Sequence, residues 1–528
     1  MFLNSKKIEK EVLYGKKKLD QDNNRAYLID LSSRLSKTNF EAKGFYFGIS
    51  NELMHTALRQ FIIQRFLFTT LNISVLRALG RKDRLIKCNL PPKFRKKLQN
   101  EEAFKSETIY NQILWIFSLL YWYIRGIYSI FEIFFNLLTG KMPDSKFNYI
   151  FFHGLSVKNF PSNFKGSKTI INWILHKEDL NQCNLVYHDA KIDRKILLKS
   201  HSIYESALPF YVTPSFINIF KYVINSIKVS LISFLKIFSG EFGYALLLSE
   251  YPKLYLSQNA GKVNYAKNYY FQNSTSIFRP LWTYNAEKNG SSVILYYYSA
   301  HLYTFKSQEG KYFNELYNYR YLSWPKYYVW HNYHKKYLLK LLGNECEEKF
   351  KIVGPIWFES NNNFRLPENL GEKKIISIFD ISVFKRTHFL SIGHPYDYYT
   401  PDILLKFHKH ILEILSEFDT VVGVLKQKRS SAKNSNLRYG KEVNDLYYKN
   451  FVLDPDNDPY KLIEKSTVSV HIPFVSTAHV SISLGIPAIY YDPGGIIQRD
   501  DEGLAGIELA KSKDELKKWL TKHIKKYL

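Results

Sequence analysis

Apolar and polar positions in the second half of the chain follow the pattern of short buried strands separated by helices. The segments 373–380 (KKIISIFD), 420–429 (TVVGVLKQKR) and 468–474 (VSVHIPF) are apolar runs of strand length, and residues 401–417 have helical spacing. Strands that alternate with helices in this way are typical of a parallel, doubly wound sheet. The pattern therefore predicts a Rossmann-like α/β domain over residues 373–510.

The first half of the chain shows the same alternation from about residue 147 onward. Strand patterns occur at 147–154 (FNYIFFHG) and 292–299 (SVILYYYS), with helical segments between them. We therefore expect a second Rossmann-like domain over residues 146–358, interrupted by a helical insertion at 205–250. The polar, Asn-rich residues 357–372 are a plausible linker between the two domains.

The residues before this domain are basic and helical in pattern, and we treat 1–145 as a separate region. Its most apolar stretch, 110–139, contains Arg125 and Glu132, which would be costly at the centre of a bilayer. The aromatic residues and flanking lysines of this stretch suit a helix that lies in the plane of a membrane interface. A membrane span and a buried domain helix are the alternatives for the same stretch.

A second apolar segment lies at 215–239. Its lysines Lys221, Lys228 and Lys236 recur at spacings of seven and eight residues, which places them near one face of a helix. Such a pattern is typical of an amphipathic helix that docks on a membrane surface. The tail at 511–528 predicts one more basic amphipathic helix.

Charge and cysteine content narrow the class of protein. The chain of 528 residues has a formal net charge of +26, which favours anionic partners such as nucleotide phosphates, lipid pyrophosphates or anionic membranes. Solvated lysines on outer faces explain the same charge equally well. The three widely spaced cysteines argue against a disulfide scaffold and a cysteine zinc site. The N-terminal residues lack an apolar signal-peptide core, so we expect a cytoplasmic protein, peripheral on the inner face of the plasma membrane.

Three basic residues, Lys426, Lys428 and Arg429, stand at the end of the predicted strand 420–429. Open parallel sheets bind ligands at the carboxyl ends of their strands. Cationic side chains at such a position can bind phosphate groups and stabilise the charge that develops on a leaving phosphate. The alternative is a solvated strand end without a ligand.

The segment 473–492 (PFVSTAHVSISLGIPAIYYD) has the order strand, helix, strand. A strand ends at Pro473, a helix begins with hydroxyl side chains, and an aspartate follows the next strand; the residues concerned are Pro473, Ser476, Thr477, His479 and Asp492. Hydroxyls and free amides at a helix start can bind phosphate, so we expect these residues near the nucleotide. An ordinary N-cap at Ser476 is the alternative, and Asp492 suits either a ribose hydroxyl or a turn.

Taken together, these segments resemble the bacterial surface-carbohydrate and capsular polysaccharide biosynthesis glycosyltransferases of GT-B fold. The resemblance covers about residues 147–495 and is carried by VLKQKR, FVLDPDNDPYKLIEKS, IPFVSTAHVSISLGIPAIYYD and FRPLWTYNAEKNGSSVILYYYS. It implies two Rossmann-like domains whose parallel sheets face a cleft, with the nucleotide in the C-terminal domain. It also implies sugar transfer from a nucleotide-sugar donor to a lipid-linked glycan acceptor, without a further cofactor.

Two comparisons with known motifs refine this expectation. Some Kdo- and sialyl-transferring enzymes carry Lys-x-His-Pro followed by Ser-Ser/Thr; Lys426 and Ser476–Thr477 are similar, but Gln427–Lys428 replaces His-Pro. Retaining GT-B enzymes often carry two glutamates eight residues apart, and the segment 473–492 contains no glutamate. We therefore expect an inverting, metal-independent reaction.

An inverting transferase needs a general base beside the acceptor hydroxyl. The candidates are His153 in the FFHG loop, then Asp189 or His188 after CNLVYHD, and Glu287 in a helical segment. Hydrogen bonding within a loop, or exposure on a helix for Glu287, are the alternative roles. No metal site is predicted, because the alternating aspartates near Pro455 are explained by a turn and by a helix cap at Asp458.

Two other functions fit parts of the sequence. A CDP-polyol phosphotransferase of the teichoic-acid type keeps the fold and changes the donor, with His394 or His479 as possible catalytic groups. A basic nucleic-acid- or membrane-binding protein belongs to another class. The basic residues are dispersed, and the sequence contains no RRM, KH or helix-turn-helix signature, so we do not expect a nucleic acid partner.

Overall fold

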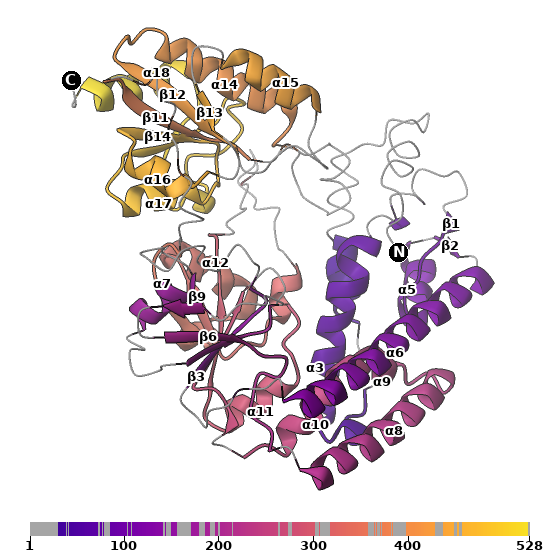
Figure 1. The fold of residues 1–528 in the computed structure, drawn as a ribbon. Coiled ribbons are helices and arrows are strands. Elements are labelled where there is room, and N and C mark those ends of the chain that lie inside the picture. Colours follow the sequence, from indigo (N-terminus) through magenta and orange to yellow (C-terminus); the bar gives the residue numbers. More distant parts are fainter. Residues whose placement is uncertain are drawn as a thin grey trace.

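The computed structural model contains two open parallel sheets and a group of long helices beside the first of them (Figure 1). Apart from a few isolated positions, the structure describes residues 30–38, 42–71, 85–102, 104–106, 108–140, 149–155, 170–178, 185–190, 196–198, 201–213, 215–261, 264–272, 277–300, 317–356, 372–381, 398–427, 437–447, 451–453 and 457–525.

The first sheet has eight strands in the order β10-β9-β8-β7-β3-β4-β6-β5, and every neighbouring pair is parallel except β5 and β6. Its strands are β3 (Tyr149–His153), β4 (Leu185–His188), β5 (Ile196–Leu198), β6 (His201–Glu205), β7 (Asn268–Gln272), β8 (Ser292–Tyr296), β9 (Lys326–Val329) and β10 (Phe350–Ile352). Its helices are α7 (Ile170–Lys177), α11 (Trp282–Lys288), η7 (Tyr317–Tyr321), α12 (Asn332–Leu342) and η8 (Asn344–Lys349).

The central strand β3 shows why the strands of the first sheet are apolar segments in the sequence. Tyr149 and Phe152 are both 0% exposed, because helices cover both faces of a parallel sheet. The chain passes from β3 to β4 on one side and later returns to β7 on the other. The carboxyl ends of β3 and β7 therefore form a topological switch point, where open α/β sheets bind ligands.

The second sheet has six parallel strands in the order β13-β12-β11-β14-β15-β16, which is the Rossmann order 3-2-1-4-5-6. They are β11 (Lys374–Phe379), β12 (Val421–Lys426), β13 (Phe451–Leu453), β14 (Val468–His471), β15 (Ala488–Tyr491) and β16 (Glu508–Ala510). The helices are α14 (Pro401–Leu415), α15 (Leu437–Leu446), α16 (Pro459–Glu464), α17 (Thr477–Ser483), η10 (Glu502–Leu504) and α18 (Lys513–Lys525). The predicted α/β fold with two Rossmann-like parallel sheets is confirmed. The predicted helix cap is confirmed too, since the Asp458 carboxylate accepts from Tyr460 N at 2.8 Å.

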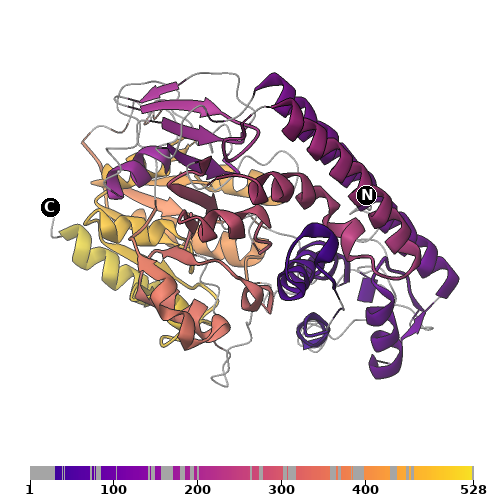
Figure 2. The same ribbon diagram turned by 90° about the horizontal axis from the view of Figure 1, so that it is seen from below.

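The long helices pack on the first sheet and share its hydrophobic core. They and their connections are η1 (Phe45–Phe47), α3 (Asn51–Ile62), η2 (Ile63–Leu71), β1 (Leu85–Ile86), α5 (Pro92–Glu102), β2 (Lys105–Ser106), α6 (Thr108–Thr139), α8 (Phe216–Phe238), α9 (Gly243–Leu247), η4 (Leu248–Glu250) and α10 (Tyr251–Gln258). Figures 1 and 2 show α6 and α8 along one flank of the first sheet, away from the second sheet. Trp115 of α6 meets Phe242, before α9, edge-on at a centroid distance of 5.2 Å. The helices before and after β3 therefore form one body with the sheet.

The two sheets meet through residues at the carboxyl end of the first. The backbone N–H of Ala300, after β8, donates to Ser476 Oγ at the start of α17 at 3.1 Å. Trp330, after β9, belongs to a buried cluster that also contains Phe379 of β11 and Val480 of α17. The carboxyl edge of the first sheet thus faces the start of α17 and the end of β11.

Candidate active site

A cavity of about 900 Å³ opens at the carboxyl ends of β3, β4 and β6, and we call it the His153 cavity. Its ionisable lining residues come from both strand ends and helices: Arg65, Glu132, His153, Asp189, Glu205, Glu250 and Lys253. Phe271 and Trp282 supply an apolar wall. Acids, bases and an aromatic surface in one cavity of this size suit the recognition of a polar ligand such as a carbohydrate.

The structure brings together two of the predicted catalytic residues. His153 ends β3 and Asp189 follows β4, and because these strands are neighbours, His153 Nδ1 contacts Asp189 Oδ2 directly. The other carboxylate oxygen, Oδ1, accepts from the backbone N–H of Gly154 at 2.8 Å. With Nδ1 turned toward the carboxylate, Nε2 is the imidazole nitrogen that remains to accept a proton. This is the arrangement of a histidine base oriented by an aspartate.

The surroundings keep the Asp189 carboxyl group ionised. Burial alone would raise its pKa, but the charge and hydrogen bond of His153, followed by the Gly154 N–H, hold the pKa well below its usual range. An ionised Asp189 stabilises the positive charge that His153 gains when it takes up a proton. His188, the other candidate from this strand end, is 0% exposed and its pKa is lowered by burial to about 4, so it lies in the core and stays neutral.

Glu250 is a further acid in the His153 cavity, and no sequence pattern pointed to it. It ends η4, and its Oε2 accepts from the backbone N–H of Leu281 at 3.2 Å. Burial raises the pKa of Glu250, against the opposing effects of that hydrogen bond and of Lys253. The cavity therefore holds one strongly ionised carboxylate, Asp189, and one carboxyl group that keeps its proton more readily.

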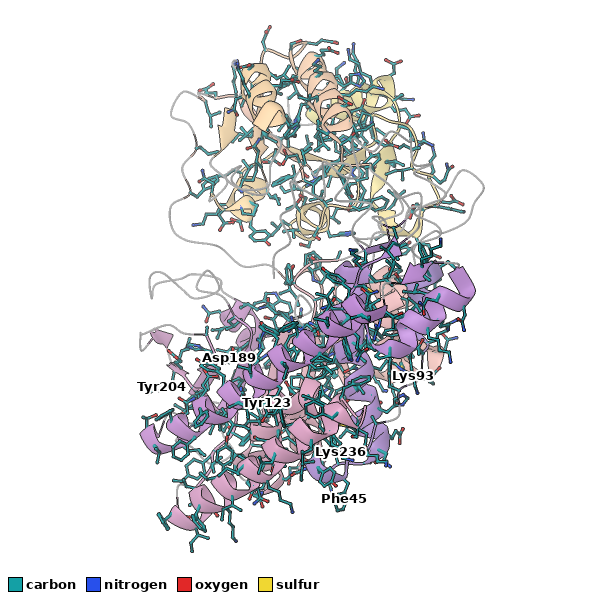
Figure 3. All side chains as sticks on the ribbon, turned by 90° about the vertical axis from the view of Figure 1, so that its right-hand side faces the viewer. Phe45, Lys93, Tyr123, Asp189, Tyr204 and Lys236 are labelled. Atoms are coloured by element: carbon teal, nitrogen blue, oxygen red, sulfur yellow. The ribbon has the colours of Figure 1, made fainter. Side chains whose placement is uncertain are left out.

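Helices complete the wall of the His153 cavity. Ser129, Glu132 and Asn136 of α6 line it, as does Arg65 of η2. The element η2 is a π-helix of nine residues that continues directly from α3. Wide helical turns of this kind are frequent at functional sites. Figure 3 shows Asp189 close to the edge of α6.

A second cavity of about 250 Å³ lies where the two sheets meet, and we call it the interdomain cavity. Tyr298 and Trp330 line it from the ends of β8 and β9 of the first sheet. The second sheet contributes polar groups from its own switch point, the carboxyl ends of β11 and β14, and from the end of the neighbouring strand β12: Asp380, Ser476, Thr477 and, on β12, Lys426. This is the place at which a Rossmann-like sheet binds a nucleotide.

Among the described residues that line the interdomain cavity, Lys426 and Asp380 are the charged ones, and they are only 6% and 4% exposed. Lys426 ends β12, and its Nζ donates to the Gln427 carbonyl at 2.9 Å. The Asp380 carboxylate follows β11; Oδ2 accepts from Tyr439 at 3.0 Å, and Oδ1 has no hydrogen-bond partner among the described residues. A buried acceptor without a partner is costly, so Oδ1 is suited to accept a hydroxyl of a ligand.

The hydroxyl residues predicted at the start of a helix do stand there. Ser476 occupies the N-cap position of α17 but makes no capping hydrogen bond, so the ordinary-cap interpretation is not what the structure shows. Its Oγ accepts instead from Ala300 of the first sheet. Thr477 Oγ1 lies 3.0 Å from His471 Nδ1, which fixes its orientation. Phe474, two residues earlier, has a φ of +66°, a strained value for a residue other than glycine.

The remaining predicted nucleotide-binding residues lie elsewhere. The carbonyl of Pro473 accepts from Tyr399 at 2.9 Å, and His479 packs against His331 with ring centroids 4.5 Å apart. The Asp492 carboxylate is 0% exposed and accepts from Tyr398, Gly494 N and Ile497 N, the bonding of a turn residue. None of these three residues lines the interdomain cavity. Lys428, Arg429 and His394 lie outside the described residues.

Glu287, the third predicted catalytic residue, stands apart from the other two. It lies in α11, and its carboxylate pairs with the guanidinium of Arg279, which is 3% exposed. It is not among the residues that line the His153 cavity. Its contacts are those of a structural ion pair.

Both cavities lie along one edge of the first sheet. The His153 cavity begins at β3, and the interdomain cavity begins at β8, with β7 between them. Neighbouring strands are about 4.8 Å apart, so these two strand ends are separated by about 10 Å. A ligand of the size of a nucleotide-sugar can therefore extend from the interdomain cavity toward His153.

Comparison with solved structures finds proteins that share structural similarity with this chain at low sequence identity. The wall teichoic acid polymerase TagF is 13% identical, with a TM-score of 0.38, and the match covers 76% of this chain and 88% of that one. Trehalose-6-phosphate synthase OtsA is 11% identical over 71% of this chain and 91% of that one, with a TM-score of 0.37. The UDP-GlcNAc 2-epimerase from Neisseria meningitidis, bound to UDP-GlcNAc, is 13% identical over 71% and 91%, with a TM-score of 0.32. Structural similarity at these low TM-scores does not indicate the reaction or the ligand of this protein.

Comparison with curated proteins finds no match. Comparison with protein families finds one over residues 230–520, more than half of the chain, which takes in β7 to β10 and the whole second sheet. The matched stretch contains the residues of the interdomain cavity and the Glu250 side of the His153 cavity. The chain therefore belongs to the family of polysaccharide biosynthesis PFTS motif proteins.

Proposed function

We propose that this protein is an inverting glycosyltransferase that moves a sugar from a nucleotide-sugar donor to a glycan acceptor. The observation that carries the proposal is the contact between His153 and Asp189, about 10 Å along the sheet edge from a cavity with a buried lysine. A base and a phosphate-binding group at that separation match the two ends of a nucleotide-sugar and its acceptor. The family to which the chain belongs agrees with a role in polysaccharide synthesis.

The interdomain cavity is assigned to the donor nucleotide. The Lys426 ammonium group offers a positive charge to the diphosphate, and the hydroxyls of Ser476 and Thr477 offer hydrogen bonds. Asp380 Oδ1 is available to a ribose or sugar hydroxyl. In this low-dielectric site a lysine stabilises the negative charge on the departing nucleotide, which is the charge that develops in the transition state.

The His153 cavity is assigned to the acceptor. The acceptor hydroxyl oxygen attacks the anomeric carbon of the donor sugar, and its proton passes to His153 Nε2. The bond from the anomeric carbon to the phosphate oxygen breaks, and the nucleotide leaves with the electron pair. Asp189 holds Nδ1 and stabilises the imidazolium ion that results. One displacement of this kind inverts the configuration of the sugar.

The donor assignment is tested by thermal shift with UDP, GDP, CDP, CMP and dTDP, and with a nucleoside as control. A nucleotide at about one hundred times its Kd stabilises the native state by about 2.7 kcal/mol. We expect one nucleotide class to raise the Tm of the wild type and of K441A, an exposed lysine in α15, and to lose most of this effect in K426A. The absence of any nucleotide response in the wild type would contradict the proposal, and transfer from CDP-glycerol would indicate the polyol-phosphate reaction instead.

The base assignment is tested with the donor that this screen identifies. D189N preserves the shape of the side chain and removes its charge, so turnover should fall about 10²- to 10⁴-fold while the nucleotide-induced Tm shift remains. E287Q serves as the matched carboxylate control: it should lower the Tm, because Arg279 loses its partner, and leave turnover per folded molecule near that of the wild type. Equal turnover losses in the two variants would remove Asp189 from the mechanism.

A further inference from the structure

The outer face of α6 is apolar along its whole length. Side chains at intervals of three or four residues point away from the fold, among them Ile109, Phe117, Ile124, Tyr128 and Phe135, which are 58–78% exposed. The opposite face packs into the core. Contiguous exposed apolar surface of this extent marks an interaction site, because a soluble monomer rarely presents so much of it to water.

Helix α8 exposes an apolar stripe, whereas its inner face mixes serines with the apolar residues Tyr222, Val229 and Ile237. Ser226, Ser230 and Ser233 face the fold and are at most 9% exposed, whereas Leu231 and Leu235 are 60% and 65% exposed. The exposed apolar stripe continues from one end of the helix to the other at helical spacing: Phe216, Ile217, Phe220, Ile224, Ile227, Leu231, Phe234, Leu235 and Phe238. A helix in water buries its apolar side. The exposed apolar stripe of α8 therefore fits a helix whose outer surroundings are apolar.

The two helices form one surface, which we call the α6/α8 platform. Figure 3 shows them side by side across one face of the molecule. Tyr123 of α6 packs against Phe234 of α8 with ring centroids 5.6 Å apart, and Tyr222 Oη donates to the Ile130 carbonyl at 2.9 Å. The two apolar stripes therefore lie next to each other and are held in fixed register.

The platform suits a helix pair that lies on a bilayer better than one that crosses it. Both helices are long and apolar enough to span a membrane by length and composition. However, their inner faces are held in the protein core, through Trp115 and Ile133 of α6 and Val229 of α8. Only the outer faces are available to lipid. A helix with one face on a protein and one apolar face outward is the arrangement of an interfacial anchor.

The charges beside the stripes match an anionic lipid surface. Lys221 and Lys228 of α8 are exposed and follow directly on apolar stripe positions, and Arg125 of α6 is exposed as well. Glu132, the acid of α6, lines the His153 cavity. Basic side chains at the edge of an inserted apolar face bind lipid phosphates, each adding to the affinity for an anionic leaflet.

We propose that the α6/α8 platform docks the protein on the anionic leaflet of a lipid bilayer and holds the His153 cavity at the lipid surface. The His153 cavity lies beside the same helix, because Ser129, Glu132 and Asn136 of α6 line it. An acceptor anchored in the same leaflet can then bring its polar end to His153 without leaving the membrane. The statement about the acceptor rests on the proposed function, whereas the docking itself does not.

The docking is tested by flotation of the full chain with vesicles of phosphatidylcholine alone and with about one third phosphatidylglycerol. We expect strong binding to the anionic vesicles, weakened at least about tenfold in I227D/L231D, which places charge in the apolar stripe. The matched control is I352D, at an exposed apolar position on the edge strand β10, which should bind as the wild type does. Similarly, K221Q/K228Q should lose about tenfold on anionic vesicles, whereas K406Q/K409Q on α14 should not.

Two outcomes would overturn the proposal. One is equal vesicle binding by the wild type and I227D/L231D. The other is a wild type that ignores vesicles and forms a dimer which I227D/L231D dissociates, since the platform would then cover a second copy of the chain. The nucleotide-induced Tm shift of I227D/L231D separates this test from the proposed function. A variant that loses vesicle binding and keeps the shift is folded and has an intact donor site.

Discussion

At the scale of single residues, two histidines at the contact between the sheets are kept neutral by their surroundings. Burial, and then the proximity of His331, lowers the pKa of His479 to about 3, and burial lowers the pKa of His331 to about 4. The centroids of their rings are 4.5 Å apart. His331 precedes α12 beside the first sheet, and His479 lies in α17 beside the second. The folded protein therefore binds these two protons much less readily than the unfolded chain does.

This difference predicts a loss of stability in mild acid. Both folded pKa values lie below the unfolded value of 6.5, so stability is complete above pH 6.5 and declines as the pH falls toward 4. Between pH 7 and pH 5 each histidine should cost about 2 kcal/mol. In Tm measurements over this range H479Q should show a shallower decline than the wild type. H523Q, in α18, should follow the wild type; a decline in H479Q as steep as that of the wild type would refute the account.

At the scale of secondary structure elements, the packing of α6 depends on one glycine. Gly126 is buried where α6 crosses η4, and a Cβ atom at this position would lie 2.5 Å from Leu248 Cβ. Gly440 in α15 is also helical, but a Cβ there would meet nothing within 4 Å. The two positions therefore separate the effect of helix propensity from the effect of packing.

The same substitution should have opposite effects at these two sites. G440A should stabilise the protein by about 0.5–1 kcal/mol, because alanine is the better helix former. G126A should destabilise it by about 1–3 kcal/mol, because the new methyl group forces α6 away from Leu248. Urea denaturation of both variants measures the two changes. A stabilising G126A would show that η4 adjusts freely and that the close approach is unimportant.

Elements buried on both faces were the most predictable from sequence. β3 and β11 appear as largely apolar runs because helices cover both sides of a parallel strand. His153 and Asp189 could be predicted as separate candidates, because each stands at the end of a predicted strand. Glu250 could not, since it ends a short helical segment whose position depends on the packing of α6. Asp380 is the last residue of the predicted strand 373–380, and the rule that ligands bind at strand ends would have identified it.

Other features depend on contacts between distant segments, which periodicity does not reveal. The apolar content of 110–139 and 215–239 predicts helices. For 215–239 the lysine spacing also predicts a membrane-docking helix, whereas for 110–139 the sequence does not decide between an interfacial, a spanning and a buried helix. The structure shows serines inward and leucines outward on α8 because the inner face is occupied by α6 and α9. Likewise, the Ser476 hydroxyl is engaged by Ala300, a residue 176 positions away in the sequence.

At the scale of the whole molecule, the three surfaces to which we assign functions meet at the first sheet. Its carboxyl edge carries the His153 cavity at β3 and half of the interdomain cavity at β8 and β9. Its flank carries the α6/α8 platform, and α6 belongs to both the platform and the wall of the His153 cavity. The second sheet reaches this assembly through the interdomain contact, so donor binding should depend on how well the two sheets are held together.

Substitution of Trp330 should show whether donor binding depends on the contact between the two sheets. Trp330 is 2% exposed, its Nε1 donates to the Tyr297 carbonyl at 2.6 Å, and it belongs to the cluster that joins the sheets. W330A should lower stability by about 3–5 kcal/mol, and it should also abolish the nucleotide-induced Tm shift, because the side chain lines the interdomain cavity. Trp519 of α18 lies in the core of the second sheet, so W519A should also lower stability while it preserves the nucleotide response. If W330A retained a full nucleotide response, the second sheet would bind the donor by itself, and the contact between the sheets would serve stability alone.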